Sequence, residues 1–231
     1  MARPPRFTAD HLLDAALELA AEGGPGAVTM AAVAKSAGAP SGSVYHRFAD
    51  RPALLSALWL RTLGGFQQGF LAALTPAAAQ GSGSGGECGA SGDRGGTGER
   101  GRERERGRGR GAHERAVRTA VAAARHTVVW SREHPAEAGV LRYGAADFGY
   151  ARWSAGARRQ LRAANRRVGE AVSALADRLG ATGPAAERVT VAVVDLPYAL
   201  VQRHLRTGTR VPEEAADTVE ECVRALLSTA R

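Results

Sequence analysis

The stretch VTMAAVAKSAGAPSGSVYHRFADRPALLSAL, residues 28–58, contains helix signals interrupted by turn residues at short intervals. Thr29 favours a helix N-cap, because its hydroxyl can accept a hydrogen bond from a free backbone amide. The residues after it form one apolar face at helical spacing: Met30, Val33, Ala34 and Ala37. Gly38 ends the pattern, so a short helix followed by a tight turn is predicted.

A second short helix is predicted after that turn, over Ser41–Phe48. Val44 and Phe48 are four residues apart and face inward together. The side chains left facing outward are polar: Ser41, Ser43, His46 and Arg47. A helix, a glycine-containing turn and a short polar-faced helix form the arrangement that places the second helix in the major groove of DNA. The stretch therefore predicts a helix-turn-helix DNA-binding domain.

Two further helices flank this motif. Before it, apolar residues recur at helical spacing over Thr8–Glu22, and a Gly-Gly-Pro-Gly run at 23–26 ends the helix. After it, Asp50-Arg51-Pro52 supplies an N-cap and a proline in the first turn, where the missing N–H costs nothing. This fourth helix is predicted to run to about Leu74 and to join two domains.

The same stretch, together with HLLDAALELAAEGG at residues 11–24, closely resembles the DNA-binding signature of TetR-family transcriptional repressors. The resemblance implies an all-α fold with a three-helix helix-turn-helix domain at residues 1–51. Residues 52–231 are then a helical ligand-sensing and dimerisation domain. It also implies a non-enzymatic, ligand-responsive repressor that binds a palindromic double-stranded DNA operator as a homodimer, with an unknown small-molecule effector.

The resemblance also implies roles for single residues. Gly38 corresponds to the family's turn glycine and Gly42 to the small residue that opens the recognition helix. Arginine and histidine can donate to guanine or phosphate, and hydroxyl groups can reach phosphates or base edges. Two alternatives stay open, in which Tyr45 packs with its hydroxyl tethered inside the domain or His46 is merely solvated. The expected DNA-binding residues are Thr29, Ser41, Gly42, Ser43, Tyr45, His46, Arg47 and Arg51.

Three departures from the family pattern concern packing and capping. Pro40 stands where a serine N-cap is usual, so capping must come from elsewhere, as from Ser41, or be lost in favour of the fixed φ of proline. Arg51 replaces the usual lysine. The positive charge is kept, but the compact ammonium group is exchanged for a planar guanidinium with several donors. Ala20 and Gly24 replace aromatic core residues, which predicts a less well packed first helix.

The composition of the whole chain agrees with packed helices, since alanine is abundant and aromatic residues are scarce. Its 231 residues carry a formal net charge of +8, which favours polyanionic partners. Residues 1–51, however, contain five basic and five acidic side chains. Two cysteines give no disulfide framework, and no stretch reaches the roughly 20 apolar residues of a membrane span. We expect a cytoplasmic protein that does not associate with a membrane.

Residues 81–112 differ in kind, with thirteen glycines, seven arginines, five acids and no large apolar residue. Such a segment has too little apolar surface to offset about 1–2 kcal/mol of backbone entropy per residue. A disordered Gly/Arg-rich insertion is therefore predicted. Its arginines at 100–110 are expected to be solvated, the sharper alternative being nonspecific contacts with phosphates.

Five later helices are predicted, at 114–133, 136–144, 154–180, 185–207 and 213–230. The last two carry apolar stripes and are expected to form a four-helix dimer interface, with an intramolecular core as the alternative. Pro197 lies inside the fourth of them and should kink it. The stripe residues are Val189, Val193, Leu196 and Leu200, and then Ala216, Val219, Val223, Leu226 and Ala230.

The few aromatic residues concentrate between 130 and 153, which indicates an apolar effector pocket with polar tips. An ordinary aromatic core is the alternative. No histidine spacing indicates a metal site, and no cofactor is expected. The candidate effector-binding residues are His126, Trp130, Arg142, Tyr143, Phe148 and Trp153.

Two other classes of function compete with a repressor. A nonspecific or architectural DNA-binding protein would bind unrelated sequences equally well. A helical enzyme or small-molecule carrier is less well supported, because the sequence contains no nucleophile–base pair, P-loop or dinucleotide fingerprint. The short polar recognition helix favours sequence reading.

Overall fold

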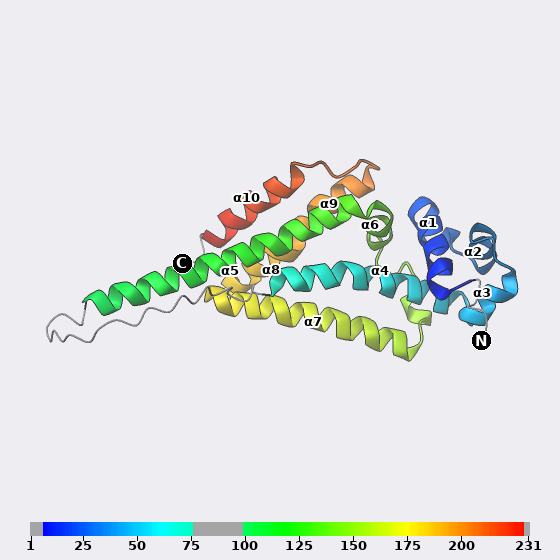
Figure 1. The fold of residues 1–231 in the computed structure, drawn as a ribbon, viewed down its shortest axis with the longest axis horizontal. Helices are drawn as coiled ribbons and strands as arrows, with labels where there is room; N and C mark the ends of the chain where they lie inside the picture. Colours follow the sequence, from blue (N-terminus) through cyan, green and yellow to red (C-terminus); the bar gives the residue numbers. More distant parts are fainter. Residues whose placement is uncertain (1–6, 76–98, 229–231) are drawn as a thin grey trace, which may run out of the picture.

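A computed structural model describes residues 7–75 and 99–228, and these residues form helices and turns without a strand (Figure 1). The all-α prediction is confirmed. The first three helices lie together at one end of an elongated molecule, and the long helices run along its body. In chain order the elements are α1 (Ala9–Ala27), α2 (Met30–Ser36), α3 (Ser41–Arg47), α4 (Arg51–Leu74), α5 (Glu99–Glu133), α6 (Pro135–Leu141), η1 (Tyr150–Arg152), α7 (Ala155–Leu179), α8 (Pro184–Thr190), η2 (Val191–Asp195), α9 (Leu196–Arg206) and α10 (Ala215–Ser228).

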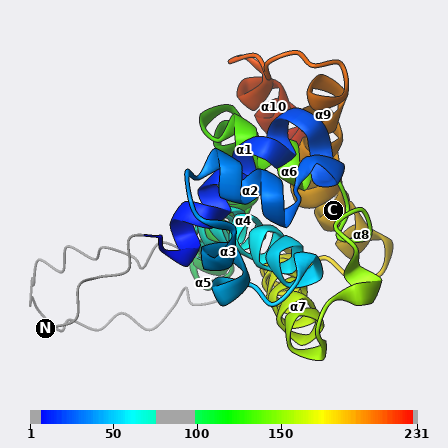
Figure 2. The same ribbon diagram turned by 90° about the vertical axis from the view of Figure 1, so that its right-hand side faces the viewer.

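The N-terminal helices begin at the residues that the sequence predicts. The Thr29 hydroxyl accepts a hydrogen bond from the Ala32 amide at 3.1 Å, and Asp50 Oδ1 accepts one from the Ala53 amide at 2.8 Å. Pro40 precedes α3 without any side-chain cap, so the capping contact is lost there. Gly38 adopts a φ of 60°, which turns the chain between α2 and α3 (Figure 2).

The chain leaves helical geometry within α1 at Gly24, where φ is 70° and ψ is −174°. The prediction that α1 packs less well at Ala20 and Gly24 is wrong. Ala20 is fully buried, and the Tyr143 hydroxyl lies 2.7 Å from the position that a Cβ on Gly24 would take. A residue from far along the chain therefore fills the space at this glycine.

Two apolar clusters form the core, and α4 belongs to both. Its first half contributes Leu54, Leu55, Leu58 and Trp59 to the N-terminal cluster, and its second half contributes Phe70 and Leu74 to the body cluster. The N-terminal cluster also contains later residues: Val140, Phe148, Trp153 and Leu161. Helix α4 therefore connects the two clusters, and side chains well beyond residue 51 pack with the first three helices.

Helix α5 starts much earlier than predicted. Residues 99–112 were expected to belong to a disordered loop, but they are the first turns of α5. The reason is cooperativity: once residues 116–128 pack in the body core, each added residue extends an existing helix and needs no core of its own. In Figure 1 this extension points away from the body, at the opposite end from α3. Residues 81–98 lie outside the described residues.

The predicted helix over 185–207 is three consecutive segments. A π-helical turn, η2, separates α8 from α9, directly before Pro197. Proline lacks the amide that an α-helix needs at this point, which accounts for the predicted interruption. This prediction is confirmed.

The apolar stripes that were expected to form a dimer interface are largely buried within one protomer. Val189, Val193, Val219 and Val223 are each 0% exposed, in the body cluster that α5 also lines. The intramolecular alternative holds for these residues, and Ala230 lies outside the described residues. None of the described helices is both long and apolar enough to cross a membrane.

Candidate nucleic-acid interface and effector cavity

Helix α3 presents a polar face on two buried anchors. Val44 is 0% exposed and Phe48 is 7% exposed, whereas Tyr45 is 58% exposed. His46 and Arg47 are exposed in the last turn, where the helix dipole favours positive charge. The alternative in which Tyr45 is a packing residue is therefore wrong.

The polar side chains of α3 make no hydrogen bonds or ion pairs with the rest of the described structure. Within residues 7–75 and 99–228, no side-chain hydrogen bond or ion pair engages Ser41, Ser43, Tyr45, His46 or Arg47. Gly42 is exposed as well, and a Cβ on it would meet nothing within 4 Å. This face keeps its donors free for an external partner.

Thr29 and Arg51 lie at the base of the motif. Thr29 is exposed, and its hydroxyl keeps a proton to donate while it caps α2. Arg51 is different, because its Nε donates to the Val28 carbonyl and its Nη2 to the Pro25 carbonyl, both at 2.6 Å. Arg51 was expected to contact DNA, but its guanidinium instead ties the turn between α1 and α2 to the start of α4.

Comparison with known proteins identifies this motif. Residues 12–58 match the family model of bacterial regulatory proteins of the tetR family. The helix-turn-helix region of this chain is therefore of the tetR type. The match covers α1–α3 and the start of α4, which is the region that presents the polar face. Comparison with curated protein sequences gave no match.

Solved structures have a similar fold along the whole chain. The fatty acid degradation regulator FadR of Bacillus halodurans has a TM-score of 0.61 at 12% identity, covering 97% of this chain and 100% of that one. A TetR-family regulator of Streptomyces coelicolor has a TM-score of 0.52 at 22% identity, covering 96% and 99%. FadR of Bacillus subtilis, solved with stearoyl-CoA, has a TM-score of 0.59 at 12% identity, covering 97% and 100%. At these identities the likeness shows the fold alone.

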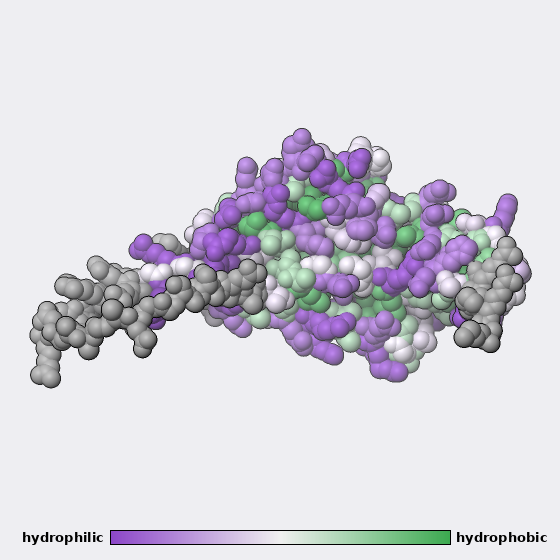
Figure 3. All heavy atoms as spheres, in the orientation of Figure 1, coloured by the Kyte–Doolittle hydropathy of each residue, from purple (hydrophilic) through white to green (hydrophobic). Residues whose placement is uncertain are grey.

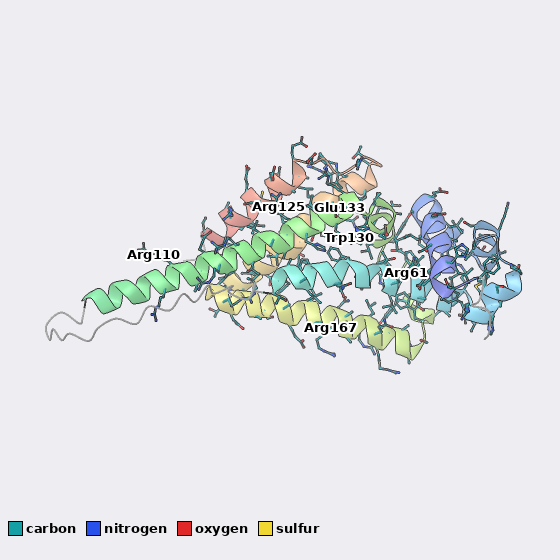
Figure 4. The ribbon with its side chains drawn as sticks, viewed as in Figure 1. Arg61, Arg110, Arg125, Trp130, Glu133 and Arg167 are labelled. Atoms are coloured by element: carbon teal, nitrogen blue, oxygen red, sulfur yellow. The ribbon has the colours of Figure 1, made fainter. Side chains whose placement is uncertain are left out.

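The body of the molecule contains an apolar cavity of about 400 Å³ between α4, α5, α6, α7 and α9. Two of the predicted effector residues, Trp130 and Tyr143, line it, and Figure 4 shows Trp130 on α5 facing the interior of the body. The other lining residues include Trp59, Phe66, Asn165, Tyr198 and Gln202, which sequence reasoning missed. They come from separate helices, so no local pattern marks them as one site.

Trp59 gives this cavity an unsatisfied donor. The side chain is 7% exposed, and its indole nitrogen is buried without a hydrogen-bond partner among the described residues. Buried N–H groups nearly always have an acceptor, so this one is a candidate contact for a bound molecule.

The remaining predicted effector residues do not line the cavity. Phe148 is 0% exposed and Trp153 is 2% exposed in the N-terminal cluster, where the Trp153 indole donates to the Phe148 carbonyl at 2.8 Å. The aromatic-core alternative holds for this pair. His126 lies behind the cavity wall, with its Nε2 3.1 Å from the Phe66 carbonyl, and burial lowers the pKa of its imidazole.

Tyr143 touches three parts of the molecule at once. It lines the cavity, its hydroxyl accepts a hydrogen bond from Arg142 Nη2 at 2.6 Å, and the same hydroxyl lies against Gly24 of α1. Tyr143 therefore connects the cavity to the C-terminal part of α1. The described residues contain no group of three or more His, Cys, Asp or Glu side chains placed to hold a metal ion.

Proposed function

We propose that this regulator is a cytoplasmic, ligand-responsive repressor that binds a palindromic DNA operator as a homodimer. The observation that carries the proposal is the polar face of α3, which has free donors and stands on the buried anchors Val44 and Phe48. Fixed anchors under a free polar face are what sequence reading in the major groove requires.

The proposed DNA contacts follow from the chemistry of each side chain. Arg47 and His46 donate to base edges or phosphates, and Ser41 and Ser43 donate to either. Tyr45 and Thr29 contact phosphates through their hydroxyl groups, and Gly42 lets the backbone approach closely. Arg51 acts indirectly, because it holds the turn before α2 in place.

A homodimer provides the two-fold symmetry of a palindromic operator. Two copies of α3 related by a two-fold axis bind half-sites one helical turn apart, roughly 34–36 Å, or a multiple of it. The double contact gives an affinity that one short helix of seven residues does not reach alone.

The proposed effector binds the apolar cavity, where the Trp59 N–H offers it a hydrogen bond. The fold relative from Bacillus subtilis was solved with stearoyl-CoA, which supports a ligand with a large apolar part. Binding moves Tyr143, and Tyr143 transmits the movement to Gly24 and the helix-turn-helix. Release from DNA then follows from a changed spacing of the two recognition helices.

Operator selection tests the DNA-binding part. The full chain is used to enrich sequences from a random DNA library, and fluorescence anisotropy then compares an enriched duplex with a shuffled one at several salt concentrations. We expect a palindromic consensus, a complex with two chains per duplex, and a clear loss of affinity in Arg47→Ala. Equal affinity for both duplexes would contradict the proposal and favour an architectural DNA-binding protein.

A further inference from the structure

A second, basic cleft adjoins the effector cavity. Four arginines line it, and we call it the arginine cleft: Arg132, Arg142, Arg206 and Arg210. It has a volume of about 770 Å³ and shares Ser131 and Leu205 with the wall of the apolar cavity. The apolar cavity and the arginine cleft are therefore adjacent at these two residues.

The charge of this cleft is nearly uncompensated. Within the described part of the chain, the carboxylate at ion-pair distance from these arginines is that of Glu213, whose Oε2 lies 3.6 Å from Arg132 Nη2. The Glu213 side chain is 85% exposed, so this contact is weak. Arg206 and Arg210 are exposed and have no carboxylate at that distance in residues 7–75 and 99–228.

Arg132 adds an independent sign of a missing partner. Its side chain is 25% exposed, but its Nε is buried and has no hydrogen-bond acceptor among the described residues. A buried guanidinium N–H without an acceptor is costly, and an anion in the cleft would supply that acceptor.

We propose that the arginine cleft binds the anionic head, a phosphate or a carboxylate, of an effector whose apolar body occupies the adjoining cavity. This inference rests on the proposed effector role of that cavity. An amphiphile fits because the apolar cavity lacks charged lining residues whereas the cleft offers several guanidinium groups.

The position of the cleft links the head to DNA binding. Ala21 of α1 lines it beside Gly139 of α6, so the helix that precedes the helix-turn-helix forms part of one wall. Arg142 also holds the Tyr143 hydroxyl at 2.6 Å, and its guanidinium lies 4.3 Å from the centre of the Tyr143 ring. An anion that attracts Arg142 therefore acts on the same side chain that the apolar body contacts.

The test compares four probes by isothermal titration calorimetry: stearoyl-CoA, coenzyme A, stearate and octadecan-1-ol. The cleft variant is Arg206→Gln/Arg210→Gln, which changes two exposed side chains. The matched control is Arg115→Gln/Arg159→Gln, which removes two exposed arginines elsewhere on the body. Both pairs change the net charge equally, and circular dichroism checks that each variant is folded.

We expect the cleft variant to weaken binding of an anionic amphiphile by about ten- to hundredfold, the control to change it less than about twofold, and octadecan-1-ol to be insensitive to both. If the cleft variant weakens the binding of stearate, the head group is a carboxylate. If it weakens stearoyl-CoA and coenzyme A but not stearate, the head group is a phosphate. Equal weakening by both variants, equal affinity of the alcohol and the anions, or no binding of any probe would overturn the inference. Anion binding that leaves operator affinity unchanged would uphold the cleft but defeat the proposed ligand response.

Discussion

Two surfaces of this molecule carry free positive charge, and they are built in opposite ways. The α3 face comes from seven consecutive residues on two local anchors, Val44 and Phe48. The arginine cleft takes its side chains from α1, α5, α6, α9 and the turn after α9, across nearly two hundred positions of sequence. The first surface depends on one helix, whereas the second exists only when the whole body has folded.

The largest expected effect concerns the local anchor. Phe48→Ala removes a buried ring and should lower the free energy of unfolding by about 3–5 kcal/mol. Tyr45→Ala, three residues earlier but 58% exposed, should leave that free energy nearly unchanged and lower operator affinity instead. Urea unfolding and fluorescence anisotropy measure the two quantities. Equal destabilisation by both changes would mean that Phe48 does not anchor α3 more than Tyr45 does.

The next effect concerns Arg51. Arg51→Ala removes two hydrogen bonds from a charged donor to the Val28 and Pro25 carbonyls and should cost about 1.5–3 kcal/mol of unfolding free energy. The control is Arg61→Ala on the same helix, labelled in Figure 4. The Arg61 Nη1 contacts the exposed Asp14 carboxylate at 2.8 Å and the Asp10 carbonyl at 3.2 Å, and these exposed contacts are expected to contribute below about 1 kcal/mol. If the two variants unfold at the same urea concentration, Arg51 does not hold the turn.

The contact between α1 and the residues after α6 can be measured with a pair of substitutions. Gly24→Ala forces a Cβ into a backbone region that suits glycine, and against the Tyr143 hydroxyl, and should destabilise the chain by about 1–3 kcal/mol. Tyr143→Phe removes that hydroxyl, so the double variant should lose less stability than the two single effects added together. Strict additivity in urea unfolding would mean that Tyr143 and Gly24 are not coupled.

The smallest effect is a pH dependence from the partly buried His126. Burial holds the pKa of this imidazole below its usual value of 6.5, so the unfolded chain binds the proton more readily than the folded one. Its contribution to stability is therefore complete above pH 6.5 and is lost as the pH falls below that value. His126→Gln should flatten the dependence of the unfolding midpoint on pH between 7.5 and about 5.5. A slope identical to that of the parent chain would disprove the assignment.

The comparison also explains what the sequence could predict. Caps and breaks such as Thr29, Asp50 and Gly38 act on their nearest neighbours, so the helix boundaries of the first domain follow from local rules. Tyr143 against Gly24 and Trp59 in the cavity wall depend on tertiary packing, which no spacing of residues encodes. The start of α5 at Glu99 was missed because a helix can extend beyond the core that nucleates it. The recognition face was therefore predictable, whereas the cavity and the arginine cleft were not.

The surface of the molecule does not mark the cleft either. Hydrophilic side chains cover most of the face shown in Figure 3 and leave scattered apolar patches between them. A reader of composition alone would place the positive charge almost anywhere on this face. Only the folded structure separates the four arginines that line the cleft from those that are simply solvated.

Helix α4 connects the cavity to the first three helices over a long distance. Its 24 residues extend about 36 Å, from Arg51 beside the recognition helix, past Trp59 and Phe66 at the cavity, to Leu74. Because Arg51 fastens the turn between α1 and α2 to the start of this helix, a tilt of α4 would carry the first helices with it. A tilt of about 5° at Phe66 displaces Arg51, about 22 Å away, by about 2 Å. Under the proposed function, an effector that moves a cavity wall by a fraction of an ångström would in this way shift α3 relative to the DNA groove.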